Sequence, residues 1–240
     1  FNAWLKDGNL EILKRLQRAG EQSVVLRIIN TIKDAYEVSR IDIRLINIYI
    51  DIVHLGGAYE AAVAICDKYL KNHSDEEIYS DREILMMSIR RLHHSMFFKP
   101  VKPLIEECLK IIDRIDAKKY PEQYAEALFL AGGNLGILSG DFVFAKKWLD
   151  TANQFSSDNG LDDYVSRIIR KMADIYNING QMDQALSLIN KYVSLQTDVT
   201  SVSASRYEVY LMGVLGETYR KMGMYQEAGY CYEQVQLASE

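Results

Sequence analysis

The chain has 240 residues, 48% of them hydrophobic and 25% charged, a balance typical of a soluble folded protein and unlike a disordered one. Its net charge of −5 leaves no broad basic surface, so this domain is not expected to bind nucleic acid directly. Only 3 prolines and 14 glycines interrupt a composition rich in helix formers, which predicts a mostly helical structure.

The cysteines and the lengths of the apolar runs indicate the cellular compartment in which the protein works. Cys66, Cys108 and Cys231 are widely spaced and form no Cys-x-x-Cys pair, which argues against a disulfide framework or a zinc site and favours a reducing cytoplasm. No apolar run approaches the roughly 20 residues needed to cross a bilayer, so no membrane association is expected. Because the sequence begins with Phe1 rather than Met, we interpret it as a candidate fragment of a larger protein.

In chain order, residues 1–38 predict a first helix pair, Leu10–Arg18 and roughly Gln22–Val38, with Gly20 as the stop between them. Four later segments then share one pattern. Each has an apolar helix, a turn with Gly, a large residue two positions on, and an Ala three positions after that. The glycine, large residue and alanine are Gly57, Tyr59 and Ala62, then Gly140, Phe142 and Ala145, then Gly180, Met182 and Ala185, and finally Gly223, Tyr225 and Ala228.

The spacing of the turn glycines indicates a fifth pair that lacks this pattern. Gly57 and Gly140 are 83 residues apart, or two units of about 41, so a pair is predicted at Ile84–Met96 and Pro103–Ile115. Pro103 suits the first turn of a helix, where a missing N–H is tolerated. No linker divides the chain, so one repeat domain is expected, with the N-terminal pair at 1–38 and repeats at 40–71, 80–116, 122–156, 161–196 and 204–240.

The C-terminal copy reads Met212-x2-Leu215-Gly216-x2-Tyr219, followed by Ala228 and Tyr232. It resembles the tetratricopeptide repeat (TPR), W-x2-L-G-x2-Y and then A-x3-F, although the leading Trp is absent. The period of about 40, longer than the 34 of the short form, resembles repeat domains of bacterial signalling and transcription regulators. The resemblance implies an all-α fold, a right-handed superhelix (α-solenoid) of about six TPR-like hairpins, and a role in binding proteins.

The TPR register implies a concave groove lined by the first helix of each pair. Amides there would pair with a peptide backbone, and guanidinium groups with carboxylates. The alternative is a solvated helix face on which residues such as Arg170 and Asp174 only pair with each other. The predicted groove residues are Arg44, Asn47, Asp51, His54, Asn134, Arg167, Arg170, Asp174, Asn177, Tyr210, Glu217 and Arg220.

No catalytic, metal or cofactor site is predicted. His93 and His94 are adjacent, so on a helix they point about 100° apart and cannot bind one ion from one face; His54 is isolated. No Gly-x-Ser-x-Gly or Gly-Lys-Ser/Thr motif occurs, and the cysteines are interpreted as small core residues. The chain is therefore expected not to be an enzyme.

The stretch A131-G-G-N-L-G-I-L-S-G-D-F142 holds four glycines and invites comparison with a phosphate-binding loop. In the repeat register Gly140 is the turn between two helices, and Gly133 occupies the position of the small residue in the TPR pattern. The strand and the Lys-Ser/Thr pair that a phosphate-binding loop requires are missing. Gly132 and Gly136 each cost a helix about 1 kcal/mol relative to Ala. We expect a neighbouring backbone to approach closely there, preferably another helix and otherwise a ligand.

The last predicted helix, Tyr225–Ser239, stays apolar to its end without a polar capping helix, which leaves a missing segment, a further domain or self-association through the C-terminal repeat as alternatives. The expected function is a non-enzymatic scaffold for a protein or peptide, as the sensor or interaction domain of a bacterial regulator of signalling or transcription. The alternatives are a phosphatase-like signalling protein that acts on a response regulator, and a purely structural oligomerisation domain.

Overall fold

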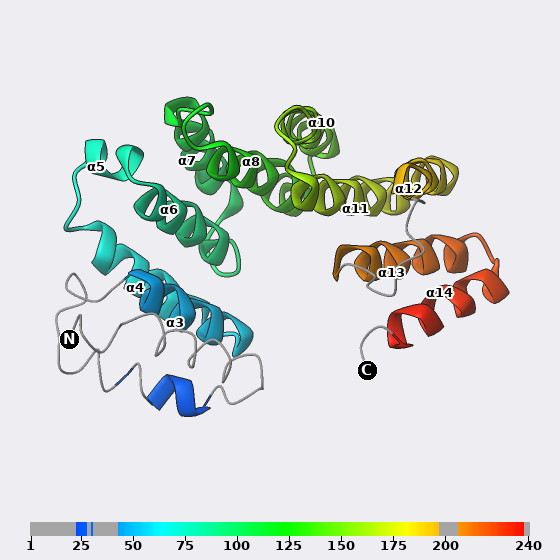
Figure 1. Cartoon of the computed structure of the whole chain (residues 1–240), viewed down its shortest axis with the longest axis horizontal. Coiled ribbons are helices and arrows are strands. Elements are labelled where there is room, and N and C mark those ends of the chain that lie inside the picture. Colours follow the sequence, from blue (N-terminus) through cyan, green and yellow to red (C-terminus); the bar gives the residue numbers. More distant parts are fainter. Residues whose placement is uncertain (1–22, 28–29, 31–42, 197–205, 238–240) are drawn as a thin grey trace. The chain divides into compact units, whose positions relative to one another are not determined.

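The computed structural model of the protein describes residues 23–27, 30, 43–196 and 206–237 (Figure 1). Within these ranges the chain forms helices and turns and no strand, so the predicted all-α class is confirmed. Residue contacts divide the chain into two compact units, Phe1–Asp116 (unit 1) and Ala117–Glu240 (unit 2). The predicted helix Leu10–Arg18 and most of Gln22–Val38 lie outside the described residues.

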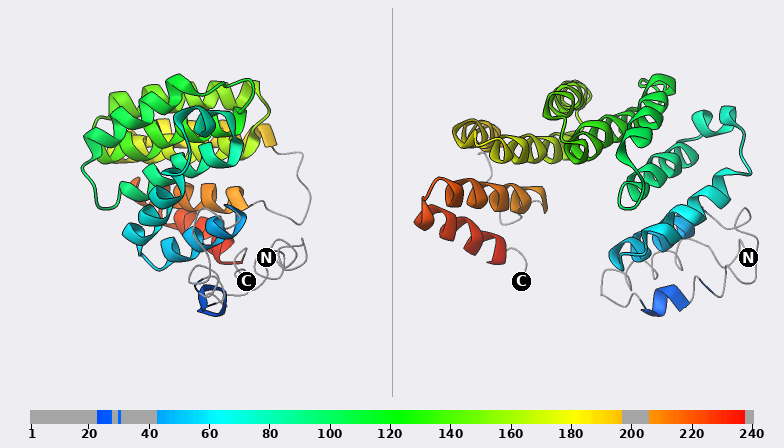
Figure 2. Two further views of the ribbon diagram at one scale, coloured as in Figure 1. Left: turned by 90° about the vertical axis from the view of Figure 1, so that its left-hand side faces the viewer. Right: turned by 180° about the vertical axis from the view of Figure 1, so that it is seen from behind.

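Unit 1 holds two described helix pairs. Helices α3 (Ile43–Leu55) and α4 (Tyr59–Leu70) lie side by side (Figures 1 and 2). The second pair, α6 (Arg82–Ser95) and α7 (Val101–Arg114), is the one predicted without a glycine turn, and Pro103 lies in the first turn of α7 as expected.

A short helix, α5 (Asp75–Ser80), occupies the connection between the two pairs of unit 1, where the sequence suggested only a loop. Its start is fixed locally by a capping box. The Ser74 hydroxyl accepts a hydrogen bond from the Glu77 amide, and the Glu77 carboxylate accepts one from the Ser74 amide. In unit 2 the connection between the first and second pairs, residues 159–161, is three residues long and has no helix of its own.

Unit 2 holds three described helix pairs, all within the part of the chain that the structure covers. The first helix of its first pair is continuous but has three segments, α8 (Pro121–Phe129), the π-helical η2 (Leu130–Gly136) and α9 (Ile137–Ser139). Its partner is α10 (Phe142–Asp158). The remaining helices are α11 (Asp162–Ile178), α12 (Met182–Gln196), α13 (Arg206–Lys221) and α14 (Tyr225–Leu237).

The repeated turn glycines end the first helix of four described pairs, all but α6–α7. The φ angles of Gly57, Gly140, Gly180 and Gly223 are 73°, 74°, 72° and 78°, a left-handed conformation that glycine adopts without a steric penalty. The repeat alanines that follow are all buried between helices. The large residue that follows the last of these glycines, Tyr225, does not pack between helices, because 73% of it is exposed.

The glycines of η2 are explained by a second helix. A Cβ atom on Gly132 would lie 2.8 Å from both the carbonyl oxygen of Ala145 and the amide nitrogen of Leu149, so the backbones of η2 and α10 are in direct contact. A Cβ on Gly136 would lie 2.8 Å from the Cα of Ala145. Helix packing, the preferred sequence interpretation, accounts for these two glycines, whereas the π-helical geometry was not predicted.

The core of each unit is apolar and takes in the cysteines. Cys66, Cys108 and Cys231 are buried and form no disulfide, as predicted, and burial raises the pKa of Cys66 and that of Cys108 to about 12. Among the described residues, no helix combines the length and apolar character needed to cross a membrane.

Candidate functional site

The predicted binding residues lie on the first helices of the pairs, which are α3 and α6 in unit 1 and α8–η2, α11 and α13 in unit 2. We call this side the first-helix face of each unit. Arg44 is exposed on α3, and Asn134 is half-buried on η2. The side chain of Tyr210 lies outside the described part of α13.

In unit 1, Arg90 of α6 joins two predicted residues of α3. Its Nη1 donates to Oδ1 of Asn47 over 2.8 Å, and its Nη2 forms an ion pair with the carboxylate of Asp51. Asn47 and Asp51 are therefore engaged in fixing α3 to α6. Sequence reasoning missed Arg90 because its repeat has no glycine turn from which to set the register.

His54 is not isolated, contrary to the sequence interpretation. Its Nδ1 lies 3.1 Å from Nδ1 of His94, and its ring centroid lies 5.7 Å from that of His93. Burial, together with the neighbouring His93, His54 and Arg90, lowers the pKa of His94 to about 3. Among the described residues, no group of three or more His, Cys, Asp or Glu side chains is arranged to hold a metal ion.

In unit 2, Arg167 of α11 binds Glu126 of α8 with both terminal nitrogens, at 2.8 Å and 3.1 Å. Its guanidinium group also lies 4.4 Å from the ring centroid of Phe129 and 5.0 Å from that of Tyr164. This bidentate, stacked arrangement holds α11 against α8. Arg167 is thus a structural residue of the first-helix face, and Glu126 is a partner that the sequence did not reveal.

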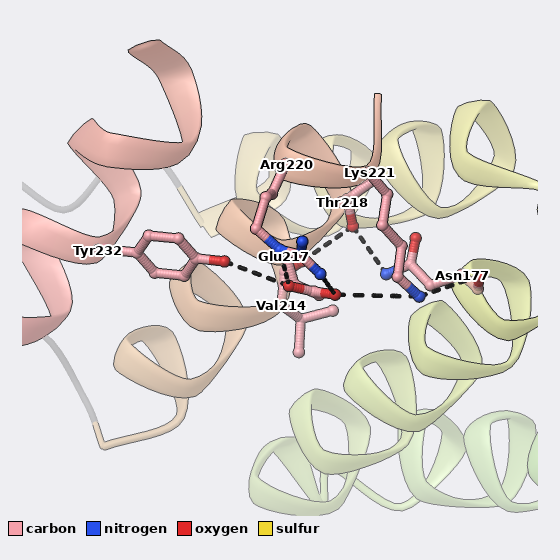
Figure 3. A network of polar contacts seen from close by, with 7 residues as sticks. All are labelled: Asn177, Val214, Glu217, Thr218, Arg220, Lys221 and Tyr232. Carbon is pink, nitrogen blue, oxygen red and sulfur yellow. Dashed lines mark hydrogen bonds and ion pairs between the residues drawn. The ribbon is translucent and has the colours of Figure 1, made fainter. Parts of the chain in front are cut away.

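Asn177 lies at the other end of α11 and is 6% exposed. Its Nδ2 donates to Oγ1 of Thr218 on α13 over 2.9 Å, and the Nζ of Lys221 donates to its backbone carbonyl over 3.2 Å (Figure 3). On α13 itself Arg220 pairs with Glu217, which also accepts a hydrogen bond from the Tyr232 hydroxyl of α14 (Figure 3). These contacts join α11, α13 and α14.

Between these two contacts, α11 carries Lys171 and Asp174, one turn apart and both half-buried. Within the described residues neither makes a hydrogen bond or an ion pair. Burial lowers the pKa of Lys171 and raises that of Asp174, so in both cases it disfavours the charged form. The stem of Lys171 packs over Gly133, where a Cβ would lie 3.3 Å from its Cγ. Arg170, the remaining predicted residue of α11, is half-buried beside them.

No family model and no curated protein matches the sequence. Solved structures do resemble the fold. Two structures of a kinesin-light-chain-type protein of Podosopora anserina with nearly identical TPR-like repeats match with TM-scores of 0.63 and 0.61, at 17% and 18% identity. They cover 85% and 84% of this chain, and in each case 96% of the other chain. BtubC of P. vanneervenii matches with a TM-score of 0.62 at 13% identity, over 95% of this chain and 91% of its own.

The chain has the TPR-like repeat fold. The resemblance found in the sequence is therefore confirmed at the level of fold, and the helix pairs described above are TPR-like hairpins. Repeats of this kind generally serve as scaffolds for protein interaction, with partners held on the face that the first helices form. The first-helix face of unit 2 contains two kinds of polar residue: those that pair across helices, and Lys171 and Asp174 of α11, which make no hydrogen bond or ion pair within the described residues.

Proposed function

We propose that this TPR-like protein binds an extended segment of a partner protein on the first-helix face of unit 2. The observation that carries the proposal is the pair Lys171 and Asp174. Both side chains are half-buried and make no hydrogen bond in the described structure, whereas Glu126–Arg167 and Asn177–Thr218 are hydrogen-bonded on either side of them.

Leaving a partly desolvated charge unpaired costs free energy, which a folded protein retains most readily where a ligand supplies the missing partner. A bound segment can bring a carboxylate to Lys171 and an N–H donor to Asp174. Asn134 on η2 can pair with the backbone of the segment without breaking a contact between first helices, which Arg167 and Asn177 cannot. Arg170, half-buried on α11, adds a positive charge beside this site.

Within this general role, the narrower proposal is that the chain is the sensor or interaction domain of a bacterial regulatory protein that works in the cytoplasm. Its support is the repeat period of 40 and 43 residues between the last three turn glycines, which resembles the long-period repeats of such regulators. A helix-turn-helix or kinase domain next to this segment in the gene would support it.

A display library of random 12-residue peptides, selected on the purified chain, tests the binding site. The variants are Lys171→Met, which keeps the stem that covers Gly133, and Asp174→Asn, which keeps the shape. We expect selected peptides to bind each variant at least ten-fold more weakly, because a charge-assisted hydrogen bond is lost. Thermal stability should stay level or rise, since each substitution removes a desolvated charge.

A matched control is Lys147→Met on α10, an exposed lysine on the second helix of its pair, which should leave peptide affinity unchanged. Arg167→Glu is a poor test, because it sets a second carboxylate against Glu126 and destabilises the fold whether or not peptide binds there. Selected peptides that bind Lys171→Met and wild type equally well would contradict the assignment.

A second candidate role, self-association through the C-terminal repeat, is favoured by one observation. On α14, Tyr225, Tyr230 and Leu237 are 73%, 61% and 64% exposed, and Tyr230 lines a pocket of about 410 Å³ with Met212 and Tyr219 of α13. A second copy would cover this aromatic surface. Tyr230→Lys should then lower the mass measured by light scattering to that of one chain, and an unchanged mass would count against this role.

A further inference from the structure

Where α5 is inserted, unit 1 has a pocket of about 420 Å³ whose lining includes none of the residues predicted to bind peptide. Its walls come from the end of α4, from α5, and from the facing sides of α6 and α7. Ile78 and Tyr79 are contributed by α5 itself. The floor is apolar, made by Leu70, Ile78 and Ile111.

The rim of this pocket is basic in a chain whose net charge is −5. Four cations, Lys71, Arg91, Lys110 and Arg114, line it with two carboxylates, Asp67 and Glu107, which gives a local net charge of +2. His73 also lines the pocket. Because the cations come from three helices, the excess is a product of the fold rather than of one basic run in the sequence.

Two of the cations have fixed orientations. Arg91 forms ion pairs with both Asp67 and Glu107, so the two carboxylates are committed to it. The guanidinium of Arg114 lies 4.0 Å from the ring centroid of Tyr79, which ties α7 to α5. Lys71 and Lys110 make no side-chain hydrogen bond or ion pair within the described residues.

We propose that this pocket binds a phosphoryl group carried on a small organic molecule or on an amino-acid side chain. Lys71 and Lys110 contact the phosphoryl oxygens as mobile point charges, and the Arg114 guanidinium, held against the Tyr79 ring, adds a fixed positive charge. The apolar floor accommodates the carrier, since the pocket is larger than one phosphate needs and lies in the range typical of small-molecule sites.

Unit 2 provides an internal contrast. A pocket of about 470 Å³ at the start of α11 is lined by Glu122, Asp162, Asp163 and the already paired Arg167. It has a similar size and the opposite charge, so pocket volume alone does not favour an anion. The basic excess sets the unit 1 pocket apart, and it arises where α5 closes the space between α4 and α7.

The test is an amide NMR titration of the full chain at constant ionic strength with inorganic phosphate, pyrophosphate, O-phosphoserine and, as a reference, chloride. We expect saturable shifts confined to α5, the end of α4 and the lining of α7, with chloride giving none. Tighter binding of O-phosphoserine than of phosphate identifies a side-chain carrier; tighter binding of pyrophosphate alone identifies a small molecule. Shifts spread over the surface, or equal shifts with chloride, would overturn the proposal.

The double variant Lys71→Met/Lys110→Met should lower the affinity for the tightest-binding of these probes at least ten-fold. Both lysines are exposed, so the fold should survive, and the amide spectrum of the free variant reports whether it does. The matched control Lys146→Met/Lys147→Met removes the same charge from exposed positions on α10. An equal loss of affinity in both double variants would show a response to net charge rather than to the pocket, and would also overturn the proposal. Because the site lies in unit 1, the result is independent of peptide binding to unit 2.

Discussion

Two helix pairs of unit 2 share one repeat register but pack differently. In the pair η2–α10, Gly132 and Gly136 stand where α13 carries Leu215 and Tyr219. The glycines let backbone meet backbone, and a Cβ at either one would lie within 3 Å of α10. In the pair α13–α14, side chains fill the interface and leave the pocket of about 410 Å³ described above.

The comparison separates what the repeat pattern determines from what it leaves open. Both pairs have the turn glycine in the left-handed conformation and the buried alanine five residues later, at Ala145 and at Ala228. The distance between the paired helices depends on residues outside that shared pattern. Substituting glycines in the two pairs therefore tests whether contact between backbones or contact between side chains sets the distance between the helices of each pair.

The largest effect is expected for Gly132→Ala. The new methyl group would lie 2.8 Å from two backbone atoms of α10, which cannot turn aside as a side chain can. Overpacking of this kind costs about 3 kcal/mol of stability, and the gain of about 1 kcal/mol in helix propensity offsets only part of it. Urea unfolding should show a markedly lower midpoint.

The control for this prediction is Gly213→Ala on α13, where a Cβ would meet no atom within 4 Å. The same substitution in open space should stabilise the protein by up to about 1 kcal/mol. If Gly132→Ala were as stable as wild type, the close contact between η2 and α10 would be wrong. Retained stability would also reopen the ligand interpretation of these glycines.

Where α3 and α6 meet in unit 1, stability depends on the protonation of a buried histidine rather than on the distance between backbones. His94 is 4% exposed there, and its pKa of about 3 in the folded state lies below the usual 6.5. The unfolded chain therefore takes up the proton first, so stability is complete above pH 6.5 and falls as pH drops from 6.5 towards 3. The expected loss is about 1.4 kcal/mol per pH unit, or about 2 kcal/mol at pH 5.

Chemical unfolding at pH 7 and pH 5 measures this loss. His94→Asn cannot titrate, so its unfolding free energy should depend less steeply on pH even though the variant starts less stable. Equal slopes for wild type and His94→Asn would show that His94 is not the group held neutral.

The fold was predictable where the determinants are local. Turn glycines, the repeat alanines and Pro103 act within a few residues, and the structure places them as expected. The π-helical turns of η2 were not foreseen, because the backbone contact with Ala145 and Leu149 is made by a different helix. The start of α5 was overlooked although its signal is local, since Ser74 and Glu77 have the spacing of a capping box.

The candidate site was less predictable, because pairing between helices depends on residues one repeat away. Arg90 meets Asn47 across 43 residues, Arg167 meets Glu126 across 41, and Asn177 meets Thr218 across 41. The TPR register predicts which residues lie on the first-helix face, but it does not predict which residues of the neighbouring helix they pair with. Since these separations equal the repeat period, a search for complementary polar residues one period apart would have found them. It would also have left Lys171 and Asp174 unmatched.

The smallest effect, and the one that decides the comparison, is expected for Gly216→Ala on α13. A Cβ there would lie 2.9 Å from Cε1 of Tyr232, nearly the same distance as at Gly132, but this atom belongs to the ring of a side chain that is 40% exposed. The second neighbour is the Cβ of the buried Cys231, at 3.1 Å. The ring can move outward at the expense of its 3.3 Å hydrogen bond to Glu217, while helix propensity improves. We expect the free energy of unfolding to change by less than about 1 kcal/mol. The double variant Tyr232→Ala/Gly216→Ala should be at least as stable as the single variant Tyr232→Ala. A loss as large as that of Gly132→Ala would mean that α13 and α14 are as tightly fixed as η2 and α10, and that glycine content does not set the distance between paired helices in this protein.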